Sequence, residues 1–516
     1  MKSRLFDYWD KLAIVLILVL ALVARVVYLP DLIKSPSEIS LNFKSLTNPI
    51  ADWHSWRQAD TASVTRELVA GNATWLIPEY HDLSNIPSGM ENPEGYRMVE
   101  FPIYNLASAW VTPLVDGNII VASRLVSITA SLITIFGLYL LVLRLCGDKV
   151  AATATATFFA IIPYSIFYSR TILPEPTLVL FSVLSLLGFS YWITSKKQGW
   201  QSISWYILSL LSFTLALLVK PTALFIAPVF VALSLTKYGW KAFIQPMLWL
   251  FLVSLIPLGI WRWWILKFPE GIPASKWLLN GNGIRLRPSW WRWLFADRLS
   301  RLILGYWGVV VVSFGIISQY SKKFKLFDVL TLSWAAGMLL YLIVFATGNV
   351  QHDYYQVQLI PILSILFGRG FSWLTADTKD TNRILKCSLA IGTTGLMLLF
   401  SWFEVSGFFN INNPAIVSAG QATNRLTPAD AIVIAPYQGD TAFLYQTNRR
   451  GWPIGFQIDE RINRGATHYI TTAYDDEAKQ LESKYFTIEK TNDYLLLDLT
   501  KPADGVTTEQ TQQGTQ

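Results

Sequence analysis

The chain has 516 residues, of which 52% are hydrophobic and only 15% are charged. This balance favours one large membrane domain with a small soluble one over several soluble domains. The net charge of +7 is, in a membrane protein, first a property of the cytoplasmic loops, so it gives no reason to expect a nucleic-acid partner.

Apolar segments recur along most of the chain. A bilayer core takes about 20 helical residues, and about eleven segments approach that length. The first is not followed by a small-residue cleavage site, so we interpret it as a retained signal anchor. The candidate spans are residues 12–29, 119–143, 150–168, 176–194, 203–219, 222–236, 245–266, 301–320, 328–346, 356–374 and 387–405.

Lysine and arginine gather in every second short loop, beginning with Lys2, Arg4 and Lys11 before the first span. Because positively charged loops stay in the cytoplasm, the N-terminus is predicted to be cytoplasmic. Eleven spans then place the C-terminus outside the membrane. The predicted outer segments are residues 30–118, 169–175, the region of Lys220, residues 267–300, 347–355 and everything after 406.

The first outer segment, residues 30–118, is far too long for a connector. Residues from Ala59 to Ala70 have helical spacing, and Trp56 and Asp60 lie on one face of that pattern. We therefore expect helices that lie on the membrane surface in this segment.

The pattern changes after the last span. Short runs rich in β-branched and aromatic residues alternate with helical stretches near 440–447 and 475–484, which predicts a soluble α/β domain over residues 406–500. The Thr-, Gln- and Gly-rich residues 501–516 are predicted to be disordered. Residues 1–405 form the predicted transmembrane domain. The expected strands are 431–435, 467–472, 485–489 and 494–499.

Ionisable residues on the outer side are the first candidates for chemistry. Glu175 lies between two prolines at the mouth of two predicted spans. Lys220 ends another predicted span on the outer side, although lysines otherwise gather in the cytoplasmic loops. A charged group at membrane depth is costly and is therefore a functional candidate; the alternative is a side chain that snorkels into the interface. His352, Asp353, Tyr354 and Tyr355 open the tenth span, where they could hydrogen-bond a sugar or a phosphate, or form an interfacial aromatic belt.

Several motifs are absent from the sequence. It has no Walker loop, no G-x-G-x-x-G after a strand, no HExxH and no paired CxxC, so no nucleotide site is predicted. The two cysteines, Cys146 and Cys387, give no disulfide framework. A divalent metal held by Asp60 or Glu175, with Asp52 and His54, is conceivable from the ligand chemistry, and no other cofactor is expected.

Four stretches, in this order and on the same side of the membrane, resemble the GT-C superfamily of membrane glycosyltransferases. The likeness is to bacterial family 39, relatives of protein O-mannosyltransferases and of the lipid A aminoarabinose transferase, over about residues 10–375. Several relatives carry an Asp-Glu pair where Thr61 here follows Asp60, so the second acid is missing. The stretches are Trp56–Thr61, Glu100–Tyr104, Ser169–Pro176 and His352–Tyr355 with Pro361.

The resemblance implies an α-helical polytopic enzyme of the bacterial inner or plasma membrane. Such enzymes move a sugar from a polyprenyl-phosphate carrier to a hydroxyl of a protein, lipid or glycan acceptor on the extracytoplasmic face. It implies Asp60 as general base in an inverting displacement, with Glu175 positioning the acceptor or sharing that role. An apolar groove between spans would hold the prenyl chain. The expected substrate-binding residues are Trp56, Arg57, Glu100, Arg170, Lys220, His352, Tyr354 and Tyr355.

Two other classes of function stay open at this stage. A lipid-linked-sugar flippase or transporter would explain the spans and the intramembrane charges, but the chain has no internal repeat. A non-catalytic subunit of an envelope polysaccharide system would share the topology without needing Asp60 and Glu175. The sequence does not distinguish between sugars or between classes of acceptor.

Overall fold

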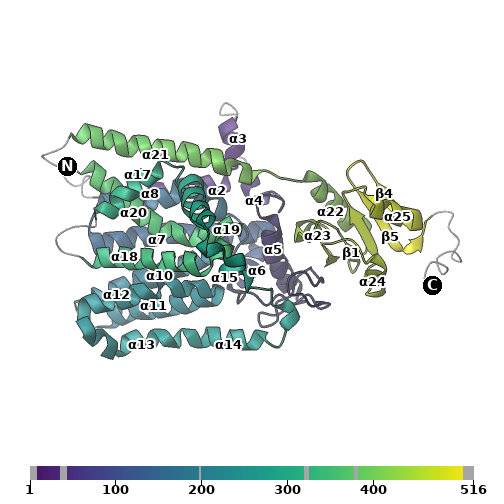
Figure 1. Cartoon of the computed structure of the whole chain (residues 1–516), viewed down its shortest axis with the longest axis horizontal. Helices are drawn as coiled ribbons and strands as arrows, with labels where there is room; N and C mark the ends of the chain where they lie inside the picture. Colours follow the sequence, from purple (N-terminus) through teal and green to yellow (C-terminus); the bar gives the residue numbers. More distant parts are fainter. Residues whose placement is uncertain (1–7, 35–42, 197–198, 319–324, 377–381, 504–516) are drawn as a thin grey trace. The chain divides into compact units, whose positions relative to one another are not determined.

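The structure is a computed structural model that describes residues 8–34, 43–196, 199–318, 325–376 and 382–503 (Figure 1). The chain folds into two compact units. Unit 1 comprises Met1–Thr47, Arg124–Trp264 and Ser275–Phe409, and unit 2 comprises Asn48–Ser123, Ile265–Ala274 and Asn410–Gln516.

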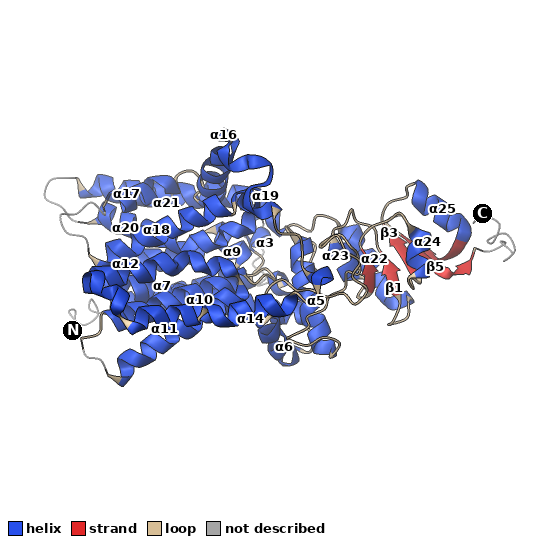
Figure 2. Ribbon diagram, turned by 60° about the horizontal axis from the view of Figure 1, so that its bottom comes forward, coloured by secondary structure: helices blue, strands red, loops and turns tan. Residues whose placement is uncertain are grey.

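Unit 1 is entirely helical in the described residues (Figure 2). The predicted spans fall on its helices, and several are broken into two pieces. Proline starts some of the second pieces, as Pro163 does in α9, because its missing N–H and fixed φ suit a first helical turn and not a helix interior. The helices are α2 (Trp9–Val26), α3 (Leu29–Lys34), α4 (Lys44–Thr47), α7 (Ile119–Cys146, which begins in unit 2), α8 (Lys149–Ile161), α9 (Pro163–Tyr168), α10 (Glu175–Ile193), α11 (Trp200–Val219), η2 (Pro221–Ile226), α12 (Ala227–Tyr238), η3 (Gly239–Ile244), α13 (Pro246–Val253), α14 (Leu255–Ile265), α15 (Trp277–Asn280), η5 (Gly281–Leu286), α16 (Pro288–Trp291), η6 (Arg292–Ile303), α17 (Gly308–Ile317), α18 (Leu326–Val344), α19 (Ala346–Gln351), η7 (Asp353–Leu359), α20 (Ile360–Thr375), α21 (Arg383–Val405) and η8 (Ser406–Phe409).

By length and composition, 7 helices of the described residues can cross a membrane, or up to 8 if the bent pair of Pro288–Ile303 and Gly308–Ile317 is one span. These helices indicate an integral membrane protein, as predicted. The number of about eleven spans stays a prediction.

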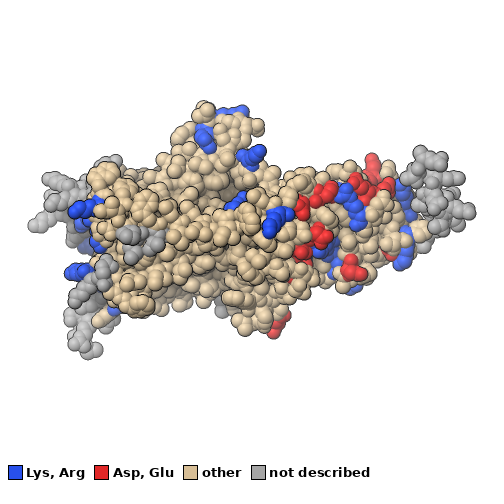
Figure 3. All heavy atoms as spheres, turned by 90° about the horizontal axis from the view of Figure 1, so that it is seen from below, with Lys and Arg blue, Asp and Glu red and all other residues tan. Residues whose placement is uncertain are grey.

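In the face shown in Figure 3, charged side chains are sparse over the helices of unit 1 and frequent over the sheet region of unit 2. The sparse charge on unit 1 fits a surface that faces lipid.

The hairpin of α10 and α11 is built by close backbone approach. A Cβ on Gly188 would lie 2.6 Å from the carbonyl oxygen of Trp205, so only glycine allows this contact. Next to it, the hydroxyls of Ser185 and Ser209 each donate to the other residue's carbonyl, at 2.8 and 2.7 Å. This register brings the first residue of α10 beside the residue that ends α11.

Unit 2 contains a five-stranded mixed sheet in the order β2-β1-β3-β5-β4 (red in Figure 2). β1 pairs in parallel with β2 and β3, whereas β5 pairs antiparallel with β3 and β4. The predicted strands and the two predicted helical stretches are present. The elements are α5 (Ser55–Ala70), α6 (Ile103–Val111), η1 (Thr112–Val115), η4 (Pro269–Gly271), α22 (Pro414–Leu426), β1 (Ile432–Ile434), α23 (Thr441–Gln446), β2 (Arg450–Trp452), α24 (Ile458–Asn463), β3 (His468–Thr471), α25 (Asp476–Lys484), β4 (Tyr485–Lys490) and β5 (Leu495–Pro502).

Residues of the long segment between the first two predicted spans join the edge of this sheet. The N–H of Leu83 donates to the carbonyl of Gly451 at 2.8 Å, and the Gly451 N–H donates to the carbonyl of His81 at 2.9 Å. Leu83 also packs in the core formed by the sheet and its helices. The predicted disordered tail lies outside the described residues from 504 onward, and its first two residues end β5.

Candidate functional site

Asp60 lies in the middle of α5, a helix that is buried along most of its length. Gly71 ends this helix at φ 79°, a conformation that favours glycine, and its N–H closes the last turn. The Asp60 carboxylate is 3% exposed. Its Oδ2 pairs with Nη2 of Arg97 at 2.7 Å, and its Oδ1 accepts the hydroxyl of Thr441 at 2.7 Å. Both oxygens are therefore bonded, and a basic residue compensates the buried charge.

Two further acids lie close to Asp60 in electrostatic terms. Burial raises the pKa of Asp82 to about 7, and the charge of Asp60 adds to the shift. Burial likewise raises the pKa of Asp440 to about 6, again with a contribution from Asp60. The guanidinium of Arg97 lies 4.9 Å from the ring centroid of Tyr80, whose hydroxyl donates to Asp82 at 3.3 Å. Of these three acids, Asp60 is the one that forms an ion pair with Arg97.

The other predicted residues of unit 2 lie on or near the same helix. Arg57, one turn before Asp60, forms an ion pair with Glu100. The carbonyl of Trp56 accepts the Thr441 hydroxyl at 3.2 Å. The structure therefore places Trp56, Arg57 and Asp60 on one helix and pairs Arg57 with Glu100.

A second cluster in unit 1 gathers five of the predicted residues. Glu175, 1% exposed, is the first residue of α10, and its Oε1 accepts a hydrogen bond from Lys220 at the end of α11. Lys220 Nζ lies 5.7 and 5.3 Å from the ring centroids of Tyr354 and Tyr355. These rings stack at 4.9 Å, and the His352 ring lies 5.4 and 5.9 Å from them. The cluster combines a buried cation with phenol and imidazole groups, which can together bind an anion.

One oxygen of Glu175 distinguishes this cluster. Within the described residues, the buried Oε2 of Glu175 has no hydrogen-bond partner. A buried acceptor without a partner costs about 1–3 kcal/mol, and more when it is charged. Such an atom is a candidate acceptor for a hydroxyl of a bound substrate.

Asp353 belongs to the candidate run His352–Tyr355 but was not among the residues expected to bind substrate, and in the structure it holds the aromatic part of the cluster in place. The hydroxyl of Tyr168 donates to its Oδ1 at 2.5 Å, and the hydroxyl of Tyr164 donates to its carbonyl. These bonds fix η7, which carries Tyr354 and Tyr355. The signal in the sequence was Asp353's place inside the His-Asp-Tyr-Tyr run.

Arg170 contacts other groups of unit 1. Its guanidinium lies 5.1 and 4.6 Å from the ring centroids of Phe167 and Phe409, and it donates to the carbonyl of Ser45 at 3.3 Å. Arg25 of α2, which was not among the predicted site residues, donates to Ser169 at 2.6 Å. A single arginine inside an apolar run is the signal that could have revealed it.

The described residues do not form a group suited to a metal ion. Among them, no three His, Cys, Asp or Glu side chains cluster closely enough to share one. The carboxylates of Asp60 and Glu175 instead pair with Arg97 and Lys220. A divalent metal at either acid stays a prediction.

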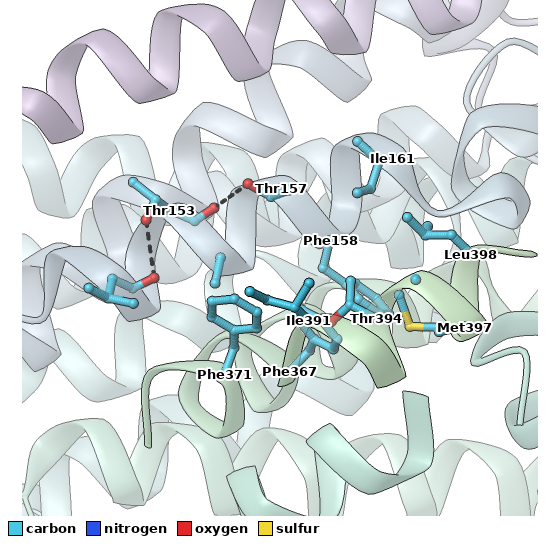
Figure 4. A pocket seen from close by; sticks show the side chains of 13 residues that line it. Thr153, Thr157, Phe158, Ile161, Phe367, Phe371, Ile391, Thr394, Met397 and Leu398 are labelled. Atoms are coloured by element: carbon cyan, nitrogen blue, oxygen red, sulfur yellow. Dashed lines mark hydrogen bonds between the residues drawn. The ribbon is translucent and has the colours of Figure 1, made fainter. Parts of the chain in front are cut away.

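An apolar cavity of about 430 Å³ lies in unit 1 between α8, α20 and α21 (Figure 4). The hydroxyls of Thr153 and Thr157 in its wall donate to carbonyls of their own helix, so they leave the lining apolar. Phe158, Phe367 and Met397 contribute to the rest of the wall.

Comparisons with known protein families and sequences give one family match. Residues 102–264 match the family model described as dolichyl-phosphate-mannose-protein mannosyltransferase. No curated protein sequence matches the chain.

Three solved structures have the same fold. ArnT from Cupriavidus metallidurans bound to undecaprenyl phosphate matches with a TM-score of 0.60 and 13% identity, over 95% of this chain and 97% of that one. The Archaeoglobus fulgidus oligosaccharyltransferase in its apo form matches with a TM-score of 0.56 and 11% identity, over 90% and 69%. AglB from the same organism, in complex with an inhibitory peptide and a dolichol-phosphate, matches with a TM-score of 0.54 and 10% identity, over 96% and 74%. The chain therefore has the GT-C fold, and its predicted resemblance to the membrane glycosyltransferases of this superfamily is confirmed.

Proposed function

We propose that this protein is a membrane glycosyltransferase that moves a sugar from a polyprenyl-phosphate carrier to an acceptor hydroxyl on the extracytoplasmic face of the membrane. The observation that carries this proposal is the fold, which this chain shares over 95% of its length with ArnT bound to undecaprenyl phosphate. The family match over residues 102–264, to mannosyltransferases named for a dolichyl-phosphate-linked sugar, supports it.

Lys220 is our candidate for holding the phosphate of the donor. It is a compact cation with three N–H donors, and Glu175 accepts from it. The phenols of Tyr354 and Tyr355 are additional hydrogen-bonding groups for the phosphate or the sugar. The unpartnered Oε2 of Glu175 would accept from a sugar hydroxyl, which would remove the cost of its burial.

Asp60 is our candidate for the general base. In the reaction, the acceptor oxygen forms a bond to the anomeric carbon while the bond from that carbon to the phosphate oxygen breaks. The electron pair leaves with the polyprenyl phosphate, and the acceptor's proton moves to Asp60. Attack from the face opposite the leaving group inverts the anomeric centre. The ion pair with Arg97 would hold the Asp60 carboxylate in position before the step.

Thr441 marks where the acceptor hydroxyl would have to lie. Its hydroxyl donates to Oδ1 of Asp60 at 2.7 Å, which is the contact that a base needs with the proton it removes. The acceptor hydroxyl would take the place of the Thr441 hydroxyl before transfer. The prenyl chain of the donor would lie against apolar helix surface, and the cavity between α8, α20 and α21 is a candidate for part of it.

The test is sugar transfer by purified protein in proteoliposomes, supplied with a panel of radiolabelled polyprenyl-phosphate sugars and with membrane extract as acceptor. Wild-type protein should transfer label from at least one donor, and Asp60→Asn should not. Asp116→Asn is a matched control, because Asp116 is exposed and its left-handed backbone, with φ 53°, suits asparagine. Label that crosses the bilayer without any transfer would contradict the proposal and indicate a flippase.

A further inference from the structure

A polar and aromatic pocket of about 240 Å³ lies within unit 2, beside the Asp60 cluster. Trp56 lines it, one helical turn before Asp60. Asp440 lines it too, and the next residue, Thr441, donates its hydroxyl to Asp60. Of its lining residues, only Trp56 was expected to bind substrate. Its lining residues are Ala51, Asp52, Trp53, His54, Ser55, Trp56, Asn412, Asn413, Ile416, Tyr437 and Asp440.

The wall formed by residues 437–440 is a tight, well-bonded turn. The N–H groups of Tyr437 and Gly439 both donate to the carbonyl of Pro453 at 3.0 Å, and the Asp440 N–H donates to the carbonyl of Tyr437 at 2.9 Å. The Asp440 carboxylate caps α23 by accepting from Ala442 at 2.7 Å. These bonds hold the backbone of the turn and the Asp440 carboxylate in place before any ligand arrives, which lowers the cost of binding.

The opposite wall is tied to the chain around α5. The Asn412 N–H donates to the carbonyl of Ala51 at 3.0 Å, and the Asp52 carboxylate accepts from Gln58 of α5 at 2.7 Å. His54, between them, has φ 55°, an uncommon conformation for a residue other than glycine. Such strained residues gather at functional sites, where the surrounding structure holds them. Asn413 joins the two walls by donating to the Tyr437 hydroxyl at 3.4 Å.

The lining combines two kinds of group that sugars need. Three aromatic rings, those of Trp53, Trp56 and Tyr437, can cover the apolar C–H face of a sugar ring. The side chains of Asp52, His54, Asn412, Asn413 and Asp440 supply acceptors and donors for hydroxyl groups. Among the described residues that line the pocket there is no lysine or arginine, so it is poorly suited to a phosphate.

Size and geometry narrow the ligand further. Pockets for drug-sized ligands measure about 300–1,000 Å³, so this pocket suits a single monosaccharide unit and not a long acyl chain. Its described lining comes from loops, an α5 turn and the start of α22, and includes no strand residue. An extended peptide usually binds along a strand edge through its backbone. The lining therefore favours a sugar over a peptide.

We infer that this pocket binds the sugar residue of the acceptor that carries the attacking hydroxyl, so that the acceptor is a glycan or glycolipid headgroup and not a peptide. The identification of the ligand as the acceptor rests on the proposed function. The binding of a saccharide to the pocket does not depend on it. The chemical class of the ligand is a neutral sugar with adjacent hydroxyl groups.

The first experiment measures binding alone. Full-length protein in nanodiscs is titrated with the methyl glycosides of glucose, mannose and galactose, with short oligosaccharides and with a panel of Ser- and Thr-containing peptides. At least one saccharide should bind, and Trp53→Ala should weaken it by about tenfold to a hundredfold through lost apolar contact. Trp75→Ala is the matched control, because Trp75 belongs to unit 2, is 49% exposed against 39% for Trp53, and does not line the pocket. The affinity of Trp75→Ala for the saccharide should stay within about twofold of the wild-type value.

The second experiment measures transfer. Trp53→Ala should raise the KM for the acceptor by about tenfold to a hundredfold and leave the KM for the donor unchanged. Tyr437→Phe removes only one hydroxyl and should raise the KM for the acceptor by about fivefold. This smaller substitution tests the pocket even if Trp53→Ala does not fold.

The outcomes separate the two claims. Transfer to peptides, or saccharide binding that Trp53→Ala leaves intact, would overturn the inference while the proposed function stands. Saccharide binding lost in Trp53→Ala, without transfer from any donor, would support the pocket and overturn the proposed function. A wild-type protein that transfers sugar but binds no saccharide of the panel would overturn the inference.

Discussion

Two of the buried acids in the described residues, Asp60 in unit 2 and Glu175 in unit 1, differ in how completely the protein satisfies them. Each pairs with one basic side chain, Arg97 or Lys220. Asp60 accepts a second hydrogen bond from Thr441, so both of its oxygens are bonded. Within the described residues, Glu175 has one oxygen without a hydrogen-bond partner.

This difference suggests different roles for the two acids. A fully bonded carboxylate keeps its position and acts only when a substrate hydroxyl replaces an internal donor, which suits a base. A carboxylate with an unpartnered oxygen gains free energy when a ligand donates to it, because the burial cost is removed. Glu175 therefore suits binding of the donor more than proton transfer.

The largest expected effect on stability comes from Lys220→Met. This variant leaves Glu175 buried without its cation, which should lower the free energy of unfolding by about 3–5 kcal/mol. The double variant Glu175→Gln/Lys220→Met should recover most of that loss, since replacing a whole buried pair is often neutral, but it should not recover transfer. Thermal unfolding in detergent measures the first effect and the proteoliposome assay the second. A Lys220→Met variant as stable as wild type would mean that Lys220 is not needed to compensate the buried charge of Glu175.

A smaller effect is expected from Thr441→Val, which removes the second hydrogen bond of Asp60 without changing the shape of the side chain. A hydrogen bond to a charged group contributes about 1.5–3 kcal/mol, so unfolding should become easier by that amount. Thr441→Ser keeps the hydroxyl and is the control. Transfer should persist in Thr441→Val, because the acceptor hydroxyl takes the same place on Asp60. Loss of transfer in a folded Thr441→Val protein would instead assign the hydroxyl a part in the reaction.

The smallest effect concerns pH. Asp82 has a folded-state pKa of about 7, against about 3.9 in the unfolded chain, so the folded protein binds its proton more tightly. Stability should therefore fall as pH rises, by about 1.4 kcal/mol between pH 6 and pH 8 from this residue. Asp82→Asn should remove that part of the pH dependence, whereas Asp116→Asn should leave it unchanged. Identical pH profiles for wild type and Asp82→Asn would contradict the assigned burial.

The helices could be predicted from the sequence because apolar length and proline position are local properties. Each of the eleven predicted segments coincides with a helix or with consecutive helices. β2 was missed because Arg450–Trp452 is short and contains Gly451, whose place in the sheet depends on close contact with Val433. A Cβ there would lie 1.8 Å from the Val433 carbonyl oxygen, and no local pattern reveals such a contact.

The site was predictable only in part. Glu175 and Lys220 stand out because charge near a membrane is costly, and Asp60 stands out through the resemblance carried by Trp56–Thr61. Their partners do not: Arg97 lies 37 residues from Asp60 and Thr441 lies 381 residues away. An arginine and a threonine are ordinary residues in a polar segment, and only the fold of unit 2 gives them a role.

The most direct test of the account compares Asp60→Asn with Glu175→Gln in transfer assays at saturating donor, with donor binding measured separately. Asp60→Asn keeps a side chain that can accept from Thr441 but loses the ion pair with Arg97, so thermal unfolding has to show that the variant is folded at the assay temperature. In the folded variant, donor binding should match that of wild type. The kcat of this variant should fall by about 10²–10⁴-fold, as expected for the loss of a general base. Glu175→Gln should mainly raise the KM for the donor. Near-normal kcat in Asp60→Asn, together with a collapse of kcat in Glu175→Gln at saturating donor, would contradict the assignment and place the base at Glu175.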